Sequence, residues 1–281
     1  MDDLTTITRD HYQAAVTDEG GLLARVGALV EAMGDGPKSA AQLAGLDQFH
    51  VGGLTATAEF ARRIGIERGC RVLDAGCGLG GPARYLAETF GCQVIGVDLT
   101  PSYVAVANLL TERAGLQDRV LCQIGDVTEL AFSDAQFDLV WTQHVAMNIR
   151  DRHALYASLR RILKPGGRLA FYDALAADAK PDVVYPTPWA ESAETSTLLT
   201  EAETRAVLAE CRFEVTRWDD VSTEAGEWLA QQRGAPAAGP AMPGGGAGLV
   251  VGPRIVEMAG NFFRSLAEGR LRLVMAVCAA I

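Results

Sequence analysis

The middle of this 281-residue chain alternates between short apolar segments and segments with helical periodicity, and this alternation restricts the fold more than any other feature. Apolar runs of four to eight residues bounded by turn signals are typical of buried strands. Repeated β-α-β units with short loops require a parallel sheet that is covered by helices on both faces. The predicted strands cover residues 70–74, 93–98, 120–126, 137–143 and 168–174, with two later strands at 213–221 and about 272–280.

The segments between the predicted strands carry signals for the starts of helices. Pro82 and Pro101 each stand in a first-turn position, where the missing N–H leaves no hydrogen bond unmade. Asp151 can cap the helix that precedes the fifth strand. Thr200 and Glu203 have the spacing of a capping box that opens a later helix. These signals support an α/β fold.

The regions on either side of the alternating segment are organised differently. Residues 1–66 contain several helical patterns but no core of their own, so we expect a helical cap that packs on the sheet. Residues 67–281 should form the core domain. Within it, segments at about 176–197 and 222–269 interrupt the alternation, and we expect these insertions to carry substrate loops.

Composition excludes several classes of protein. The formal net charge is −10 and Lys and Arg form no run, which argues against a nucleic-acid surface. No stretch approaches 18 uninterrupted apolar residues, and the first ten residues lack the apolar core of a signal peptide. The six cysteines form no C-x-x-C pair and no metal-like spacing with the four histidines. We therefore expect a cytoplasmic protein without a metal, a membrane or a nucleic-acid partner.

The segment VLDAGCGLGG supports two interpretations. Gly76, Gly78 and Gly81 spell the G-x-G-x-x-G of dinucleotide-binding proteins, whereas Asp74, Gly76, Gly78 and Gly80 spell D-x-G-x-G-x-G. In both, the glycines let the backbone turn tightly after a strand and approach a ligand. The carboxylate of Asp74 would repel a pyrophosphate but attract an ammonium group, such as that of the methionine part of S-adenosylmethionine.

Acidic residues also end the next two predicted strands. Asp98 can accept hydrogen bonds from both ribose hydroxyls of an adenosine, which NAD and S-adenosylmethionine share. Asp126 can accept from an adenine amino group, with Val127 against the ring. A dinucleotide enzyme does not need the acids at 74 and 126. Three acids at three consecutive strand ends therefore favour S-adenosylmethionine over NAD.

Four segments resemble, in order and spacing, the motifs of the class I S-adenosylmethionine-dependent methyltransferases: VLDAGCGLGGPARYLA, VIGVDLTPSYVAVAN, IGDVTEL and LKPGGRLAFYDA. The resemblance is strongest over about residues 48–175. DQFHVGGLTATAEFA and FDLVWTQHVAMNI also resemble the small-molecule branch that includes bacterial sarcosine/dimethylglycine methyltransferases. The resemblance implies a Rossmann-like sheet of seven mostly parallel strands, the last antiparallel, with helices on both faces and an N-terminal helical cap.

The resemblance also implies a binding site at the carboxyl ends of the first four strands. The residues at the first strand would hold the methionine end of the cofactor, those at the second the ribose and adenine, those at the third the adenine, and the backbone at the fourth the methionyl portion. By matching position, the cofactor-binding residues are Asp74, Gly76, Gly78, Gly80, Asp98, Leu99, Asp126, Val127 and Gln143.

The acceptor side of the site departs from the pattern of the family. Several small-molecule relatives place a histidine a few residues after the fourth strand, where this chain has Met147 and Asn148. The imidazole is instead at His144, which we predict to be the catalytic base, although a structural histidine bonded to backbone is the alternative. The predicted substrate-binding residues are Tyr12, His50, Asn148 and Trp189.

The sequence therefore predicts an enzyme that uses S-adenosylmethionine to methylate a nitrogen or oxygen of a small molecule, such as a secondary metabolite or a small amine. Two alternatives stay open at this point. One is an enzyme of the same fold that binds S-adenosylmethionine but performs cyclase or cyclopropane-type chemistry. The other is an NAD-dependent reductase, which Asp74 disfavours.

Overall fold

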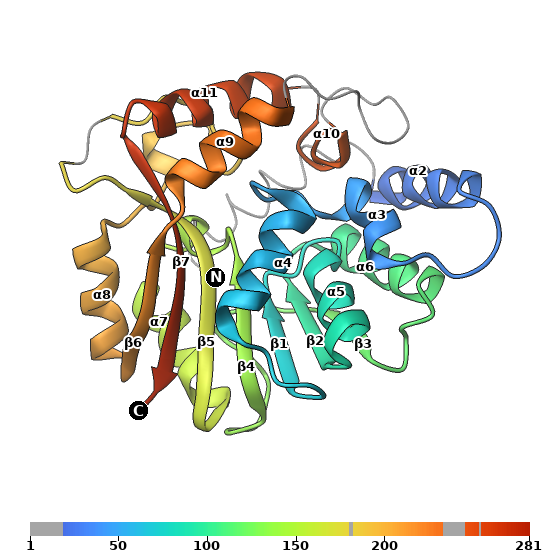
Figure 1. Cartoon of the computed structure of the whole chain (residues 1–281), viewed down its shortest axis with the longest axis horizontal. Helices are drawn as coiled ribbons and strands as arrows, with labels where there is room; N and C mark the ends of the chain where they lie inside the picture. The colour runs from blue at the N-terminus through green and yellow to red at the C-terminus, as the bar shows by residue number, and fades with distance from the viewer. Residues whose placement is uncertain (1–18, 180–181, 233–244, 253) are drawn as a thin grey trace.

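The computed structural model describes residues 19–179, 182–232, 245–252 and 254–281. Its strands, in chain order, are β1 (Arg71–Ala75), β2 (Gln93–Asp98), β3 (Val120–Ile124), β4 (Phe137–Gln143), β5 (Leu163–Ala176), β6 (Phe213–Asp220) and β7 (Leu271–Ala280). They form one sheet in the order β3-β2-β1-β4-β5-β7-β6 (Figure 1). β7 runs antiparallel to both of its neighbours, and the pairs among β1 to β5 are parallel. The predicted fold class is confirmed.

The described helices begin before the sheet and then alternate with its strands. They are α2 (Glu19–Ala32), α3 (Ala40–Asp47), α4 (Gly53–Ile64), α5 (Gly81–Phe90), α6 (Pro101–Arg113), α7 (Arg152–Ile162), α8 (Glu201–Glu210), α9 (Ser222–Gln232), α10 (Gly245–Val251) and α11 (Ile255–Ala267). Two short 3₁₀ helices, η1 (Ala146–Asn148) and η2 (Ala193–Thr195), follow β4 and β5.

Two apolar layers hold the helices on the sheet. One layer joins the sheet to α4, α5, α6 and α11, with Phe60, Leu86 and Phe262 among its buried side chains. The other joins the opposite face to α7 and α8 through residues such as Leu159 and Leu208. Helices α9, α10 and α11 lie above the carboxyl ends of the parallel strands (Figure 1). That end of the sheet is therefore covered in part by helices from the C-terminal part of the described chain.

A third apolar cluster ties the first helices to the rest of the molecule. Leu22 and Val26 of α2 and Leu43 of α3 are fully buried in a cluster that includes Leu110 of α6 and Leu249 of α10. These helices thus bury their apolar side chains against the core domain. The division into a cap at 1–66 and a core at 67–281 stays a prediction.

Most element boundaries agree with the sequence-based predictions, with two corrections. Asp151 accepts from the N–H of Ala154, and Thr200 forms the predicted capping box with Glu203. β5, however, begins at Leu163 rather than at 168, because Leu163 already pairs with β4. The third strand ends at Ile124 rather than at 126, because the chain turns there to begin the next loop.

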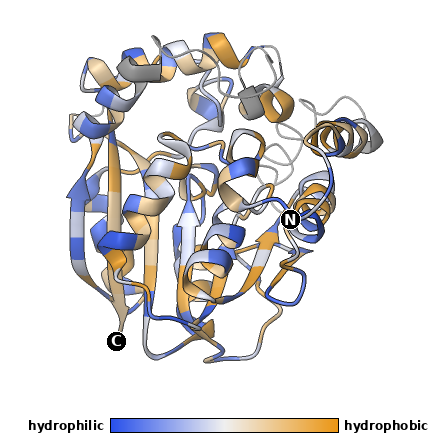
Figure 2. Ribbon diagram, turned by 45° about the vertical axis from the view of Figure 1, so that its right-hand side comes forward, coloured by the Kyte–Doolittle hydropathy of each residue, from blue (hydrophilic) through white to orange (hydrophobic). Residues whose placement is uncertain are grey.

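The exposure of the strands follows their place in the sheet. Figure 2 shows that the edge strand β6 is more hydrophilic than the strands beside it. Most residues of β7 are buried, whereas β6 has one buried residue, Phe213. Among the described residues, no helix combines the length and the apolar character that are needed to cross a bilayer.

Gly96 of β2 provides a test of the packing behind the first strand. A Cβ at this position would lie 2.8 Å from Cys77 Sγ and 2.9 Å from Cys122 Sγ. Gly96→Ala should therefore destabilise the fold by about 1–3 kcal/mol, the usual cost of overpacking. At Gly260 of α11 no described atom lies within 4 Å of such a Cβ, so Gly260→Ala should stabilise by about 0.5–1 kcal/mol. Urea denaturation measures both, and equal stability of the two variants would contradict this account.

Candidate functional site

The turn after β1 lies close to the backbone at the end of β2 and to the side chain of Val145, which follows β4. Gly76, Gly78 and Gly80 all have positive φ angles, of 76°, 52° and 75°. The N–H of Gly76 donates to the carbonyl of Val97 at the end of β2. A Cβ on Gly76 would lie 2.2 Å from Cγ2 of Val145, which follows β4. An L side chain at Gly76 is therefore excluded by both conformation and space.

Two carboxylates flank this glycine turn, the buried Asp74 and the half-buried Asp98. Asp74 is 2 % exposed, and its Oδ2 has no hydrogen-bond partner among the described residues. Burial, and then the charge of Asp98, raises the pKa of Asp74 to about 7. Asp98 accepts from the N–H of Gly78 and from the N–H of Thr100, both at 2.9 Å, and burial raises its pKa as well. Two such carboxyl groups create a site whose charge would be balanced by a cationic ligand.

The other residues predicted for the adenosine lie near the ends of β2 and β3. Leu99 is half-buried directly after Asp98, and Val127 is buried. Oδ1 of Asp126 accepts from both the N–H and the hydroxyl of Thr128, so the carboxyl group is fixed by a local turn. A carboxylate has about four acceptor positions. This turn thus leaves Asp126 able to accept further hydrogen bonds.

The side chain of Gln143, at the end of β4, has a defined orientation. The indole N–H of Trp141 donates to Gln143 Oε1 at 3.1 Å, and an indole nitrogen can only donate. The amide oxygen is therefore identified by its partner, and Nε2 stands on the opposite side. Nε2 is buried and has no hydrogen-bond partner among the described residues. Gln143 thus offers two unused N–H donors.

His144 adopts a conformation that is unusual for a residue with a side chain. Its φ is 55°, and its N–H donates to the carbonyl of Tyr172 at 2.7 Å. The next N–H, of Val145, donates to the buried carboxylate of Asp173 at 2.8 Å. Residues held in this region often serve a function that requires the strain. Burial, with a smaller contribution from His50, lowers the pKa of His144 to about 3, so the ring is neutral at pH 7.

His50 reaches the same place from the segment before α4. Its ring stacks on His144 with centroids 6.2 Å apart and an interplanar angle of 7°. Its Nε2 is hydrogen-bonded to Gln48 Oε1 at 2.8 Å and lies 3.0 Å from the buried hydroxyl of Thr57. Burial lowers the pKa of His50 to about 4. The structure thus brings two neutral imidazoles together, each from a different part of the chain.

The contacts around these histidines include residues that the sequence analysis did not select. Tyr172 of β5 meets the His144 ring edge-on, with centroids 4.7 Å apart. Gln48 and Thr57 contact His50, and Trp141 orients Gln143. For these four residues, the sequence offered one signal of a role in the site: Gln48 stands two residues before His50 in DQFHVGG. Tyr172 and Trp141 lie in strands, where their sequence pattern indicates only burial.

The remaining predicted substrate residues have separate surroundings. The amide of Asn148 in η1 donates to the backbone carbonyls of His144 and Val145. Trp189 is buried, packs edge-on against Phe262, and donates to the Ser196 hydroxyl at 3.1 Å. Tyr12 lies outside the described residues. The substrate roles of these three residues stay predictions.

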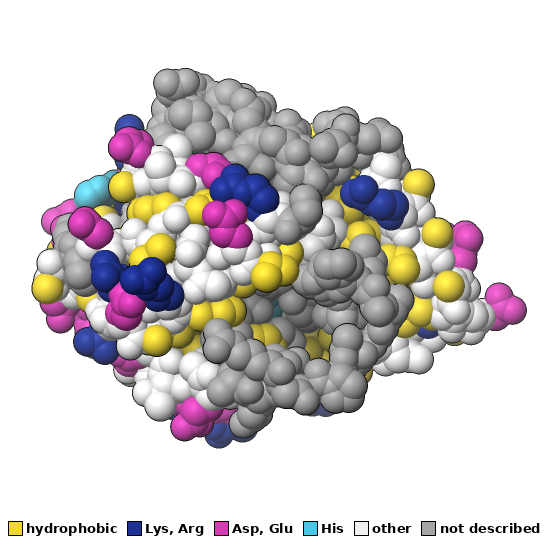
Figure 3. Space-filling model, turned by 90° about the horizontal axis from the view of Figure 1, so that it is seen from above, with side chains coloured by type: hydrophobic (Ala, Val, Ile, Leu, Met, Phe, Trp, Pro, Cys, Tyr) yellow, Lys and Arg dark blue, Asp and Glu magenta, His cyan; other side chains and the backbone are white. Residues whose placement is uncertain are grey.

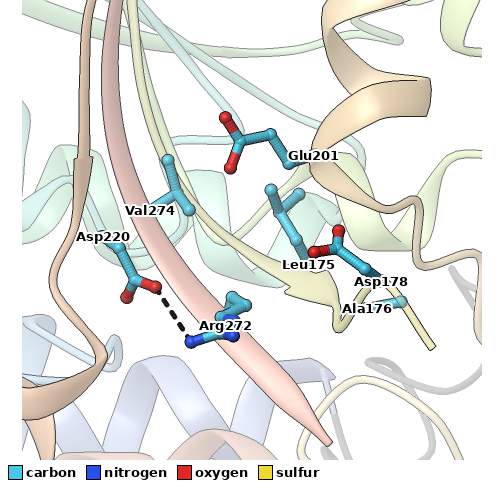
Figure 4. A pocket seen from close by; sticks show the side chains of 7 residues that line it. All are labelled: Leu175, Ala176, Asp178, Glu201, Asp220, Arg272 and Val274. Carbon is cyan, nitrogen blue, oxygen red and sulfur yellow. Dashed lines mark hydrogen bonds and ion pairs between the residues drawn. The ribbon is translucent and has the colours of Figure 1, made fainter. Parts of the chain in front are cut away.

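Figure 3 looks onto the end of the molecule above the strands, where described hydrophobic side chains gather around a central hollow. A separate pocket of about 190 Å³ lies on the β5, β6 and β7 side of the sheet (Figure 4). It contains none of the predicted site residues and is lined by Leu175, Ala176, Asp178, Glu201, Asp220, Arg272 and Val274.

In the described part of the chain, no group of three or more His, Cys, Asp or Glu residues has an arrangement that could hold a metal ion.

Comparison with known proteins identifies the segment that carries the glycine turn. Residues 73–171 match the family model described as a methyltransferase domain. A probable tocopherol O-methyltransferase, chloroplastic, of Oryza sativa subsp. japonica is 41% identical over 98 residues, which are 35% of this chain and 27% of that protein. Methyltransferase GfsG of Streptomyces halstedii is 33% identical over 138 residues, 49% of this chain and 50% of that protein. The chain thus matches between about a quarter and a half of the length of these relatives.

A solved structure shares the fold over a longer part of the chain. Geranyl diphosphate C-methyltransferase from Streptomyces coelicolor A3(2), in complex with Mg²⁺, geranyl diphosphate and S-adenosyl-L-homocysteine, superposes with a TM-score of 0.65 at 18% identity. The match covers 81% of each chain. This superposition confirms the predicted seven-stranded fold, and the family model confirms the predicted resemblance to methyltransferases over residues 73–171.

The two neutral histidines predict a pH dependence of stability. Their folded pKa values of about 4 and about 3 lie below the ordinary value of 6.5. Below pH 6.5 the unfolded chain binds protons that the folded chain does not, so both histidines lower the free energy of unfolding as the pH falls from 6.5 towards 4. His144→Asn, which tolerates a positive φ, should make this loss smaller.

Urea denaturation at pH 7.5 and pH 5 measures this difference for each variant against the parent protein. The comparison between variants is needed because Asp74 and Asp173, whose pKa values burial raises to about 7, act in the opposite direction over the same range. His153→Gln removes an exposed histidine and should not reduce the loss of stability. If His144→Asn and the parent lost the same free energy of unfolding between pH 7.5 and pH 5, the His144 ring would be protonated in the folded protein at pH 5.

Proposed function

We propose that this chain, whose residues 73–171 match the model of a methyltransferase domain, transfers a methyl group from S-adenosylmethionine to a nitrogen or oxygen of a small-molecule acceptor. The observation that carries the proposal is the pair of carboxylates, the buried Asp74 and the half-buried Asp98, on either side of the glycine turn. The neighbouring imidazoles at the end of β4 supply groups that can meet an acceptor. Proteins named as methyltransferases share both the domain and the fold.

The residues at the glycine turn fit S-adenosylmethionine better than a dinucleotide. The unpartnered Oδ2 of Asp74 suits an ammonium group, and a cation there would relieve the repulsion between Asp74 and Asp98. A pyrophosphate would add to that repulsion. Asp98 uses one acceptor position of each oxygen for backbone N–H groups, so further positions are free for hydroxyl groups. Leu99, Asp126 and Val127 would border the adenine.

Methyl transfer from a sulfonium requires mainly that the protein position the acceptor and exclude water. S-adenosylmethionine, when bound, supplies a methyl group on a sulfonium, which already contains a good leaving group. The chain's own residues must hold the acceptor in line and accept its proton when the acceptor is a hydroxyl or an ammonium. We assign proton acceptance to the imidazole of His144 because it directly follows β4 at the carboxyl end of the sheet; burial keeps the ring uncharged and also lowers its basicity. The Gln143 amide and His50 would orient the acceptor.

For the branch of the family, the compartment and the acceptor, we propose what the sequence analysis predicts. We place the chain in the small-molecule branch that includes the sarcosine/dimethylglycine methyltransferases, acting in the cytoplasm on a secondary metabolite or small amine. The two relatives whose names include a substrate, tocopherol and geranyl diphosphate, act on small molecules, which supports an acceptor of this size. Tyr12, Asn148 and Trp189 would complete the acceptor side, with residues 1–66 as a cap.

Calorimetry tests the cofactor. The chain should bind S-adenosylmethionine and S-adenosylhomocysteine more tightly than NAD. Asp98→Ala should weaken the binding of S-adenosylhomocysteine by about 1.5–3 kcal/mol, the usual contribution of hydrogen bonds to a charged group. Asp118→Ala, at an exposed loop position, serves as the matched control and should leave the affinity unchanged. Tighter binding of NAD, or an unaltered Kd in Asp98→Ala, would contradict the assignment of the site.

Methyl transfer to a panel of amines and hydroxyl compounds, followed with isotopically labelled methyl groups, tests the reaction. With an accepted compound, His144→Ala should lower kcat by about 10²–10⁴-fold, as expected for loss of a general base, and should leave cofactor affinity nearly unchanged. If His144 only orients the acceptor, the loss will be smaller and partly in KM. A near-normal kcat would remove His144 from the mechanism. Product formation without label transfer would instead favour cyclase-type chemistry.

A further inference from the structure

Arg84 is a charged side chain that the binding site described above does not use. It lies in α5, directly behind the glycine turn, and is 0 % exposed. Its guanidinium donates to the carbonyl of Leu79 within the turn and to Oδ2 of Asp47 at 2.8 Å. It also donates to the carbonyl of Ala107 and to the hydroxyl of Thr111, both in α6. Arg84 therefore connects α3, the glycine turn and α6.

The end of α3 also packs directly on the first residue of α5. A Cβ on Gly81 would lie 2.7 Å from the carbonyl oxygen of Asp47 and 2.8 Å from its Oδ1. It would lie 2.9 Å from Nε2 of Gln48. Glycine at this position thus permits a contact between the first helices and the glycine turn that any side chain would obstruct. This contact is independent of the ion pair and occurs at the same place.

From Asp47 the polar contacts continue to the acceptor side of the site. Gln48 Oε1 is bonded to His50 and accepts from the Thr57 hydroxyl at 2.9 Å. The same hydroxyl lies 3.4 Å from Gln143 Oε1. The chain of contacts thus runs from the glycine turn through α3 to the residues that surround His144. The side chains along it are buried or half-buried.

Burial of the ion pair makes these contacts interdependent. Asp47 is 3 % exposed, and separation of α3 from α5 would leave the Arg84 guanidinium buried without its counter-charge. An unpaired buried charge is strongly unfavourable. The carbonyl of Leu79 depends on the same guanidinium, so the turn that would hold the cofactor keeps its shape best when α3 is docked.

We propose that Asp47 and Arg84 are positioning residues that couple the docking of α3 and α4 to the conformation of the glycine turn. Cofactor binding and formation of the acceptor side then support each other, because both require the same arrangement of Arg84. The inference rests on the proposed use of S-adenosylmethionine at the glycine turn. A merely structural ion pair would affect unfolding but not the affinity for the cofactor.

The primary test compares Asp47→Asn with the full-length parent, using S-adenosylhomocysteine as the probe. Asp47→Asn should raise the Kd about tenfold, within the usual range of coupling between sites. Glu31→Gln is the matched control, because it removes an exposed ion pair with Arg113 that also joins an early helix to α6. The control should leave the Kd unchanged. Equal Kd values for the parent and Asp47→Asn would overturn the proposal.

A second variant and a second measurement separate positioning from loss of folding. Gly81→Ala displaces Asp47 without removing a charge, and it should raise the Kd in the same direction while circular dichroism shows a folded protein. Hydrogen exchange in α3 and α4 should slow on addition of S-adenosylhomocysteine in the parent and change less in both variants. No such slowing in a parent that binds the probe would overturn the coupling.

A double-mutant cycle tests whether the coupling extends to the acceptor side. Thr57→Val removes the hydroxyl that donates to Gln48 Oε1 and lies 3.4 Å from Gln143 Oε1. If the contacts act as a unit, the effects of Thr57→Val and Asp47→Asn on the Kd will not be additive. Additive effects would contradict the connection to the acceptor side. Failure of the parent protein to bind S-adenosylhomocysteine would instead reject the proposed function, so the two failures are distinguishable.

Discussion

The close approach of backbone segments at Gly76 is the constraint on which the site depends. At this point the chain leaves β1, bonds to the end of β2 through Val97, and touches Val145 after β4. The ends of β1 and β2 and the Val145 side chain after β4 are thus brought together at a distance that a side chain at Gly76 would prevent. The same approach forms the place where ligands bind in open α/β sheets, outside the carboxyl ends of the strands near a change in strand order. Asp74, Asp98 and His144, at the ends of these strands, lie along one edge of the sheet as a consequence.

Burial then determines the charge state of these neighbours. It raises the pKa of Asp74, so on the acidic side the ionised carboxylate is favoured only when a cation lies beside it, and it lowers the pKa values of His50 and His144, so the imidazole side remains neutral. A methyl donor that carries a sulfonium and an ammonium suits the first side. An acceptor that must lose a proton suits the second. The two groups of side chains thus acquire different charge states from the same desolvation.

Helices from the early and the late parts of the described chain surround the acceptor side of the site. The early helices contribute His50 and Thr57 and bury apolar side chains against α6 and α10. The later helices lie above the strand ends, where α11 supplies Phe262 to the apolar layer around Trp189. The polar contacts between Arg84 and Asp47 cross the junction of the early helices with the core. The acceptor side is therefore a product of packing between segments that are distant in sequence.

The sequence by itself determined the features that depend on neighbouring residues. Strand and helix periodicity predicted the sheet, the caps at Asp151 and Thr200 were read from short spacings, and the glycine turn followed from backbone stereochemistry. Acids at three strand ends could be placed at one edge of the sheet because parallel strands end there together. Only the tertiary structure decided that His50 stacks on His144, that Trp141 orients Gln143, and that Arg84 pairs with Asp47. The stacking and the ion pair join residues that are far apart in sequence. The orientation of the Gln143 amide depends on side-chain rotamers in a packed interior, and periodicity and spacing carry no information about either.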